Sequence, residues 1–74
     1  MHRQRVGSSC IHAVGYDAEN EILEVEFKHG AIYRYRRITQ RTHDEFMSAD
    51  SHGAYLNRHI RDVYPYTEVR PGLH

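Results

Sequence analysis

Residues 21–37 read EILEVEFKHGAIYRYRR and decide the fold. Apolar and charged residues alternate over residues 21–28, and the alternation returns over residues 31–37. This period of two is typical of strands that bury one face. Gly30 separates the two runs and suits a left-handed turn position. The stretch therefore predicts a β-hairpin.

The residue types also predict the register of this hairpin. A two-residue loop would set Val25 opposite Arg34 and mix polar with apolar side chains on both faces. A three-residue loop over residues 28–30 instead sets Val25 opposite Tyr33 and Glu24 opposite Arg34, which pairs like with like and joins opposite charges. We predict the three-residue loop because it agrees with both alternating patterns.

A further strand is predicted before the hairpin. Residues 9–16 (SCIHAVGY) are rich in β-branched and aromatic residues and lead into a turn at residues 17–20. Ile11 and Val14 have opposite parity in a regular strand. Either one of them faces outward or the strand carries a bulge, for which Gly15 is suited.

The first of two predicted helices follows the hairpin. It begins after Thr39 or Thr42 and runs to about residue 49, with Phe46 and Met47 as its buried stripe. Residues 42–45 (THDE) have the form of a capping box, in which Glu45 would reach back to the start of the helix.

The second helix is predicted to begin at Asp50 or Ser51 and to end at Pro65. Apolar residues at i, i+4 and i+7 form its buried face; they are Leu56, Ile60 and Val63. Residues 66–69 are a candidate for a short closing strand.

These elements predict an α+β domain. It consists of a three-stranded antiparallel β-meander followed by two short helices, which pack on one face, with a short C-terminal strand as an addition. We expect the folded domain to cover residues 6–69, with flexible ends at residues 1–5 and 70–74.

Composition limits the classes of function. The chain has 74 residues, with ten basic and ten acidic side chains, so its net charge gives no sign of a nucleic-acid partner. No apolar run is long enough for a membrane span, and the basic N-terminus leads into no signal segment. A single cysteine, Cys10, forms no internal disulfide. We expect a cytoplasmic domain without membrane contact.

Several short motifs, taken in order and spacing, resemble the KTSC domain family. The segments that carry the resemblance are VGSS (6–9), VGYD (14–17), LEVEF (23–27), Gly30, YRY (33–35), SHGAYLN (51–57) and Ile60-Arg61. The family is named from the C-terminus of some lysyl-tRNA synthetases and also occurs alone in small bacterial and phage-borne proteins. The resemblance implies no catalytic activity, and it suggests RNA binding by association with a tRNA-handling enzyme. The chain departs from the family pattern at Thr39, His43 and Leu56, which affects packing only.

RNA binding needs cations for phosphate and flat side chains for stacking. Nine of the ten basic residues are arginine, whose planar fork suits phosphate, although a GC-rich genome would supply arginine as well. The candidate contacts are Arg34, Arg36, Arg37, Arg41, Arg58, Arg61, Tyr55 and His59. The register turns Tyr33 and Tyr35 toward the core, so we interpret them as structural, with an exposed stacking platform as the alternative.

A second candidate site lies at the start of the second helix. Ser51, Gly53 and Asn57 could bind an anion there, or Ser51 could be a simple helix cap. We expect no metal and no cofactor, because the seven histidines lack ligand spacings. We expect no small-molecule substrate and no catalysis by Cys10, which we place in a half-buried position.

Two hypotheses of function follow. The domain is a non-enzymatic module that contacts RNA, including tRNA, through an arginine-rich surface. Alternatively, it docks on a protein partner or on itself through Tyr55, Tyr64, Tyr66 and a free sheet edge. Arginines gathered on one face would favour RNA, and dispersed arginines would favour protein.

Overall fold

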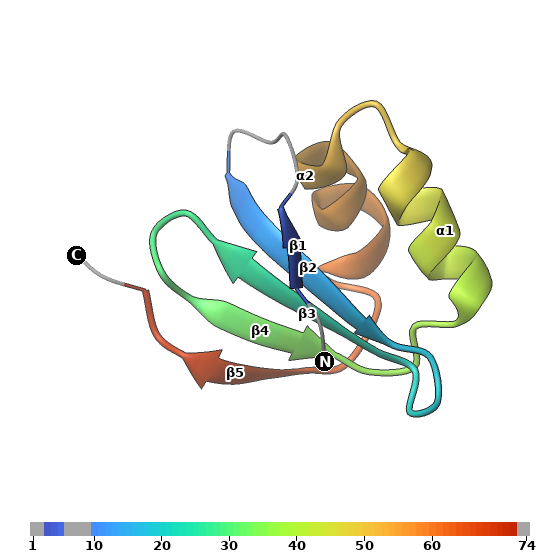
Figure 1. Cartoon of the computed structure of the whole chain (residues 1–74), viewed down its shortest axis with the longest axis horizontal. Helices are drawn as coiled ribbons and strands as arrows, with labels where there is room; N and C mark the ends of the chain where they lie inside the picture. The colour runs from blue at the N-terminus through green and yellow to red at the C-terminus, as the bar shows by residue number, and fades with distance from the viewer. Residues whose placement is uncertain (1–2, 6–9, 73–74) are drawn as a thin grey trace.

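The structure is a computed structural model that describes the backbone of residues 3–5 and 10–72 and the side chains of residues 10–72. Five strands form one antiparallel sheet in chain order. They are β1 (Arg3–Arg5), β2 (Ile11–Asp17), β3 (Ile22–Phe27), β4 (Ile32–Tyr35) and β5 (Tyr66–Arg70). The helical elements are α1 (Gln40–Ser48), α2 (His52–Tyr55) and the π-helical turn η1 (Leu56–Ile60). They connect β4 to β5 and gather on one face of the sheet (Figure 1), so the α+β prediction is confirmed.

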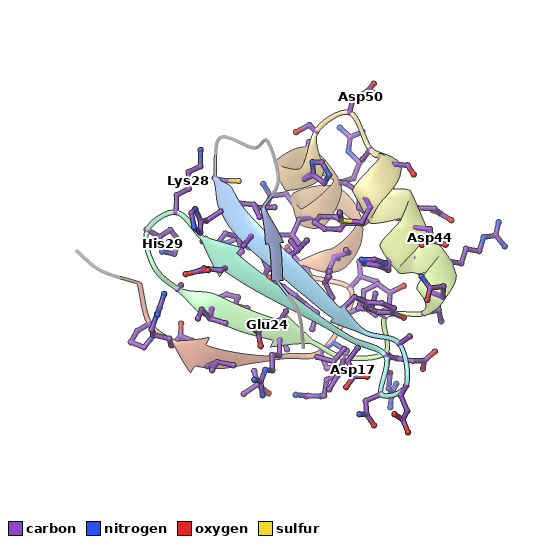
Figure 2. The ribbon with its side chains drawn as sticks, in the orientation of Figure 1. Asp17, Glu24, Lys28, His29, Asp44 and Asp50 are labelled. Carbon is purple, nitrogen blue, oxygen red and sulfur yellow. The ribbon has the colours of Figure 1, made fainter. Side chains whose placement is uncertain are left out.

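The predicted hairpin register is confirmed. Val25 lies opposite Tyr33 and Glu24 lies opposite Arg34 in the β3–β4 pair. In the turn, the Gly30 amide donates to the Phe27 carbonyl oxygen at 2.9 Å. Gly30 has a φ of 101°, in the region that favours glycine. Figure 2 shows Lys28 and His29 at the tip of this hairpin.

The bulge in β2 lies elsewhere than predicted. The register with β3 shifts between Ile11 and Ala13, and Gly15 pairs regularly with Glu24. The extra residue changes the parity of the strand, so Ile11 and Val14 both face the core, where they are 0% and 2% exposed. Of the two alternatives that the parity conflict left open, the structure therefore shows the bulge, at Ile11–Ala13 and not at Gly15.

The sheet extends beyond the predicted meander at both edges. Residues 1–5 were expected to be flexible, but Arg3–Arg5 pairs with β2 as strand β1. The predicted closing strand at residues 66–69 is present as β5 and includes Arg70. The Arg70 guanidinium donates to the Gly30 carbonyl at 2.7 Å and to Glu26 at 3.1 Å, so residue 70 belongs to the sheet and not to a tail. Ser8 and Ser9, which carry part of the family resemblance, lie outside the described residues.

Side-chain caps fix the starts of both helices. The Thr39 hydroxyl accepts from the Thr42 amide at 3.3 Å, so Thr39 is the cap of α1 and the capping box predicted at residues 42–45 does not begin it. The Ser51 hydroxyl accepts from the Ala54 amide at 3.2 Å at the start of α2. Both caps satisfy amides that have no partner within the helix.

The second helix ends earlier than predicted because it widens into a π-helical turn. The Arg61 amide donates to the Leu56 carbonyl at 2.7 Å, five residues back. Leu56 and Ile60 are buried as predicted, but Val63 is 65% exposed. The wider turn rotates the following residues, and Tyr64 packs against the core in place of Val63.

The core lies between the sheet and the helical layer. Its fully buried side chains are Ile11, Val14, Leu23, Val25, Tyr35, Ile38, Phe46, Leu56 and Ile60. In the described part of the chain, no helix has the length and apolar character needed to cross a membrane.

Candidate functional site

A groove of about 240 Å³ opens between the β3–β4 hairpin and η1. Phe27, Tyr33 and Tyr35 line it from the hairpin strands, and Leu56 and Asn57 line it from η1. Arg61, which follows η1, and Cys10 and His29 complete the lining. The groove is therefore aromatic and apolar, and Arg61 is the cation with a permanent charge among its described lining residues.

The two tyrosines of the Y-x-Y motif occupy different environments. Tyr35 is 1% exposed, and burial raises its pKa to about 12. Tyr33 is only partly buried, and its ring stacks on Tyr66 with a centroid distance of 5.1 Å. Its hydroxyl donates to Glu68, and this hydrogen bond is the main cause of its raised pKa. Tyr35 thus belongs to the core, whereas Tyr33 joins the core to the groove.

Asn57 and Arg61 contribute the polar part of the groove. Both side chains are exposed, and the Arg61 guanidinium donates to the Asn57 amide oxygen at 3.5 Å. The positive charge of Arg61 acts to lower the pKa of both Tyr33 and Tyr35, against the effect of burial. Its influence on both phenols agrees with its place in the lining of the groove. The π-helical turn that carries Asn57 is a local irregularity of a kind frequent at functional sites.

The other candidate arginines are dispersed over the molecule. Arg34 and Arg36 alternate with the inward tyrosines and lie on the open face of the sheet, where Arg34 pairs with Glu24 at 2.8 Å and Arg36 donates to Thr67. Arg41 pairs with Glu45 along α1 at 3.3 Å.

Two further candidates, Arg37 and Arg58, are exposed. Arg37 lies between β4 and α1 with a φ of 65°, a left-handed conformation, and Arg58 lies on η1. Of the six candidate arginines, Arg61 alone lines the groove, so the structure does not gather them into one arginine-rich surface.

Tyr55 and His59 lie on the α1 side of the second helix. Their rings are 4.6 Å apart, and the Tyr55 ring also packs against Phe46 at 6.0 Å. The Tyr55 hydroxyl donates to Glu45 at 3.2 Å, and burial, followed by the charge of Glu45, raises its pKa. Tyr55 is thus committed to the packing of α1 on α2, and neither ring lines the groove.

The three residues predicted to bind an anion do not form one site. The Ser51 hydroxyl is engaged as the cap of α2, and Gly53 is buried. Asn57 lies in the groove with Arg61. Asn57 therefore belongs to the groove and not to an anion site with Ser51 at the start of α2.

Sequence reasoning assigned Phe27 to the core and missed its place in the groove. Cys10 was expected to be half-buried, but it is exposed and lines the groove with His29. The pairing of the first strand with the hairpin could have predicted that Cys10 and His29 lie close together. In the structure, this pairing includes a hydrogen bond of 2.9 Å from the Lys28 amide to the Cys10 carbonyl.

The described histidines have no arrangement suited to a metal ion. No group of three or more His, Cys, Asp or Glu residues is placed to hold such an ion among the residues that the structure describes. His43 and His52 bury their Nδ1 atoms. Burial lowers the pKa of His43.

Comparison with known proteins identifies the family of this chain. The KTSC domain family model matches residues 7–64. The chain belongs to the KTSC domain family. Within that span, the KTSC residues Tyr33, Tyr35, Asn57 and Arg61 come from segments far apart in sequence and meet around one groove.

Several bacterial relatives share this KTSC domain. An uncharacterized protein of Stutzerimonas stutzeri is 41% identical over 58 residues, which cover 78% of this chain and 82% of that protein. A protein of Tsukamurella paurometabola is 39% identical over 54 residues, which cover 73% of this chain and 81% of that protein. A lysine–tRNA ligase of Nostoc is 30% identical over 61 residues, which cover 82% of this chain but only 11% of the ligase.

The crystal structure of a KTSC domain protein from Yersinia pestis has the same fold. It superposes with a TM-score of 0.87 at 36% identity, and the match covers 93% of this chain and 97% of that one.

Proposed function

We propose that this KTSC domain is a non-enzymatic RNA-binding module and that RNA contacts the groove between the hairpin and η1. The dispersal of the candidate arginines argues against the arginine-rich surface expected from the sequence and favours a protein partner by that criterion. The RNA proposal is therefore carried by a different observation, the convergence of an aromatic ring (Tyr33), an amide (Asn57) and a guanidinium (Arg61) in one groove. Rings, hydrogen-bonding amides and arginine are the groups that proteins use for unstacked RNA. The related region of a lysine–tRNA ligase supports tRNA as the first RNA to test.

The groove is a better candidate than the open face of the sheet. On that face Arg34 and Arg70 are paired with Glu24 and Glu26, so positive and negative charges alternate. A phosphate bound at Arg34 or Arg70 would compete with the carboxylate that already pairs with that arginine. The Arg61 guanidinium donates to the Asn57 amide oxygen, and its remaining N–H groups are able to donate to a phosphate.

Titration of labelled tRNA at two ionic strengths tests the proposal. We expect binding at low salt that weakens as salt rises, because phosphate contacts release counterions. Arg61→Ala should weaken binding about tenfold, the effect of losing one charge-assisted contact. Arg41→Ala is the matched control, because Arg41 lies on α1 outside the groove. Absence of binding at low salt would end the proposal.

A second candidate function rests on a different observation. Strand β5 ends the sheet and is exposed along its whole length, with Tyr66 51% and Val69 46% exposed. An exposed edge strand with apolar side chains is able to pair with another chain. Light scattering over a range of concentrations, followed by pull-down from lysate, distinguishes self-association and a protein partner from RNA binding.

A further inference from the structure

We infer that the groove accepts one unpaired nucleotide of an RNA, with its base on the aromatic lining and its phosphate at Arg61. The inference rests on the proposed RNA binding and names the feature of the RNA that the groove requires. It commits the site to an unstacked base at an end, bulge or loop, and not to the surface of a duplex.

The size of the groove favours a single ring system. Its volume of about 240 Å³ lies below the range of about 300–1,000 Å³ that holds drug-sized ligands. A base within a duplex is stacked on both sides and shows its neighbours only its edges, so it cannot place a face against this lining. An unpaired base can.

The aromatic lining offers rings from both strands and from the turn of the hairpin. Phe27 and His29 lie nearly parallel, at 4° and a centroid distance of 5.5 Å, and the Tyr33 ring meets Phe27 edge-on at 5.5 Å. The stacking of Tyr33 on Tyr66 fixes the orientation of the Tyr33 ring before any ligand arrives. Rings held in place in this way stack on a base with little loss of side-chain entropy.

The polar groups complement the rest of a nucleotide. Asn57 carries both donors and an acceptor, which suits the edge of a base, and the Arg61 fork suits a phosphate. The Glu68 carboxylate accepts a hydrogen bond from the Tyr33 hydroxyl, and the charge of Asp62 acts on Tyr35. Arg61 is the lining residue with a permanent positive charge, so a phosphate is expected at its guanidinium.

Four probes distinguish the contribution of the base to affinity from that of the phosphate. They are a blunt RNA duplex, the same duplex with a one-nucleotide 3′ overhang, the same overhang without its base, and free adenosine monophosphate. We expect the overhang to bind about tenfold more tightly than the blunt duplex, within the range measured for one base stacked on aromatic side chains. The abasic overhang should lose most of this advantage, and the free mononucleotide should bind much more weakly than the overhang.

Variants of the lining residues test whether the tighter binding of the overhang depends on the groove. Tyr33→Leu should remove the advantage of the overhang and leave the affinity for the blunt duplex unchanged, whereas Tyr64→Leu, a tyrosine outside the groove lining, should keep the advantage. Phe27→Leu serves as a second lining variant if Tyr33→Leu fails to fold, which thermal unfolding shows. Arg61→Ala should weaken binding of the overhang with or without its base.

The outcomes are distinct. Equal affinity for blunt, overhang and abasic RNA would overturn the unpaired-nucleotide site and leave RNA binding in place. Failure of every RNA to bind at low salt would overturn the proposed function as well. Free mononucleotide binding as tightly as the overhang would overturn the requirement for RNA and make a free nucleotide the ligand.

Discussion

Arg34 Nε lies 2.8 Å from the Glu24 carboxylate, and the two residues face each other directly across β3 and β4. Figure 2 shows Glu24 on the central strand of the sheet. Its side chain is only 7% exposed, whereas that of Arg34 is 50% exposed. The pair therefore joins a nearly buried carboxylate to a half-exposed cation, and this cation has a structural role in fixing the register of the hairpin.

Removal of this cation tests that role. Arg34→Ala should lower the free energy of unfolding in urea by about 1 kcal/mol, because it removes the charge-assisted hydrogen bond from Arg34 to Glu24 across the two strands. RNA affinity should stay unchanged, since Arg34 lies on the face away from the groove. Lys28→Ala, at the exposed hairpin tip, is the control for a general loss of positive charge. A loss of RNA affinity equal to that of Arg61→Ala would show that the open face of the sheet binds RNA instead.

Alkaline titration should reveal Tyr35 as the last tyrosine to ionise. Burial raises its pKa from 10.0 to about 12, so the folded state favours the neutral phenol. The stabilisation is complete below about pH 10 and is lost as the pH rises from there toward 12. Ultraviolet absorbance of tyrosinate follows the six tyrosines. Tyr35→Phe should abolish the step near pH 12; persistence of that step would place the buried phenol elsewhere.

His43 should make the domain less stable in acid. Its ring stacks on Tyr16 at 4.2 Å, and burial holds its pKa below the ordinary 6.5. Because the folded state favours the neutral ring, stability is complete above about pH 6.5 and falls as the pH drops below it. His43→Phe keeps an aromatic ring against Tyr16 and should reduce the loss of unfolding free energy between about pH 7.5 and pH 5.5. His59→Gln, at an exposed position, should leave the loss unchanged; a loss of the same size in His43→Phe would exclude His43 as its source.

Ser51 should act through folding and not through anion binding. Ser51→Ala removes the cap of the Ala54 amide and should lower the free energy of unfolding by about 1 kcal/mol. Ser51→Asp preserves a capping oxygen and should restore most of this stability. RNA affinity measured at a temperature where all variants are folded should be equal in the three proteins. A tenfold weaker affinity in Ser51→Ala alone would return Ser51 to the anion site predicted with Gly53 and Asn57.

The sequence was most informative where local chemistry and structure coincide. The alternation through Leu23, Val25 and Phe27 fixed the strand, and the pairing of Glu24 with Arg34 fixed the register, because a slip of one residue would move every side chain to the wrong face. The caps at Thr39 and Ser51 follow from hydrogen bonds that span three residues. Each of these features depends on near neighbours in the chain or on one tight turn.

The candidate site was predicted only in part. Asn57 and Arg61 were named as candidates, and the predicted register already paired Arg34 with Glu24. Nothing in the sequence distinguished Arg61 from the other exposed arginines as the one that lines a groove. That distinction depends on packing: the π-helical turn after Tyr55 rotates residues 57 and 61 toward the hairpin and turns Val63 into solvent. The apolar spacing of the second helix was interpreted with 3.6 residues per turn, so it did not predict this change of helical period.

The amino-acid order alone determined an α+β domain with a central hairpin of known register, since side chains on a pleated strand alternate regardless of what lies beyond it. Only the tertiary structure decided that β1 joins the sheet, that β5 pairs with β4, and that Tyr33 and Arg61, far apart in the chain, line the same groove. These features depend on contacts between segments that are distant in the chain. These contacts form the backbone hydrogen bonds between strands and set the path of the helix across the sheet, and no local sequence pattern encodes them.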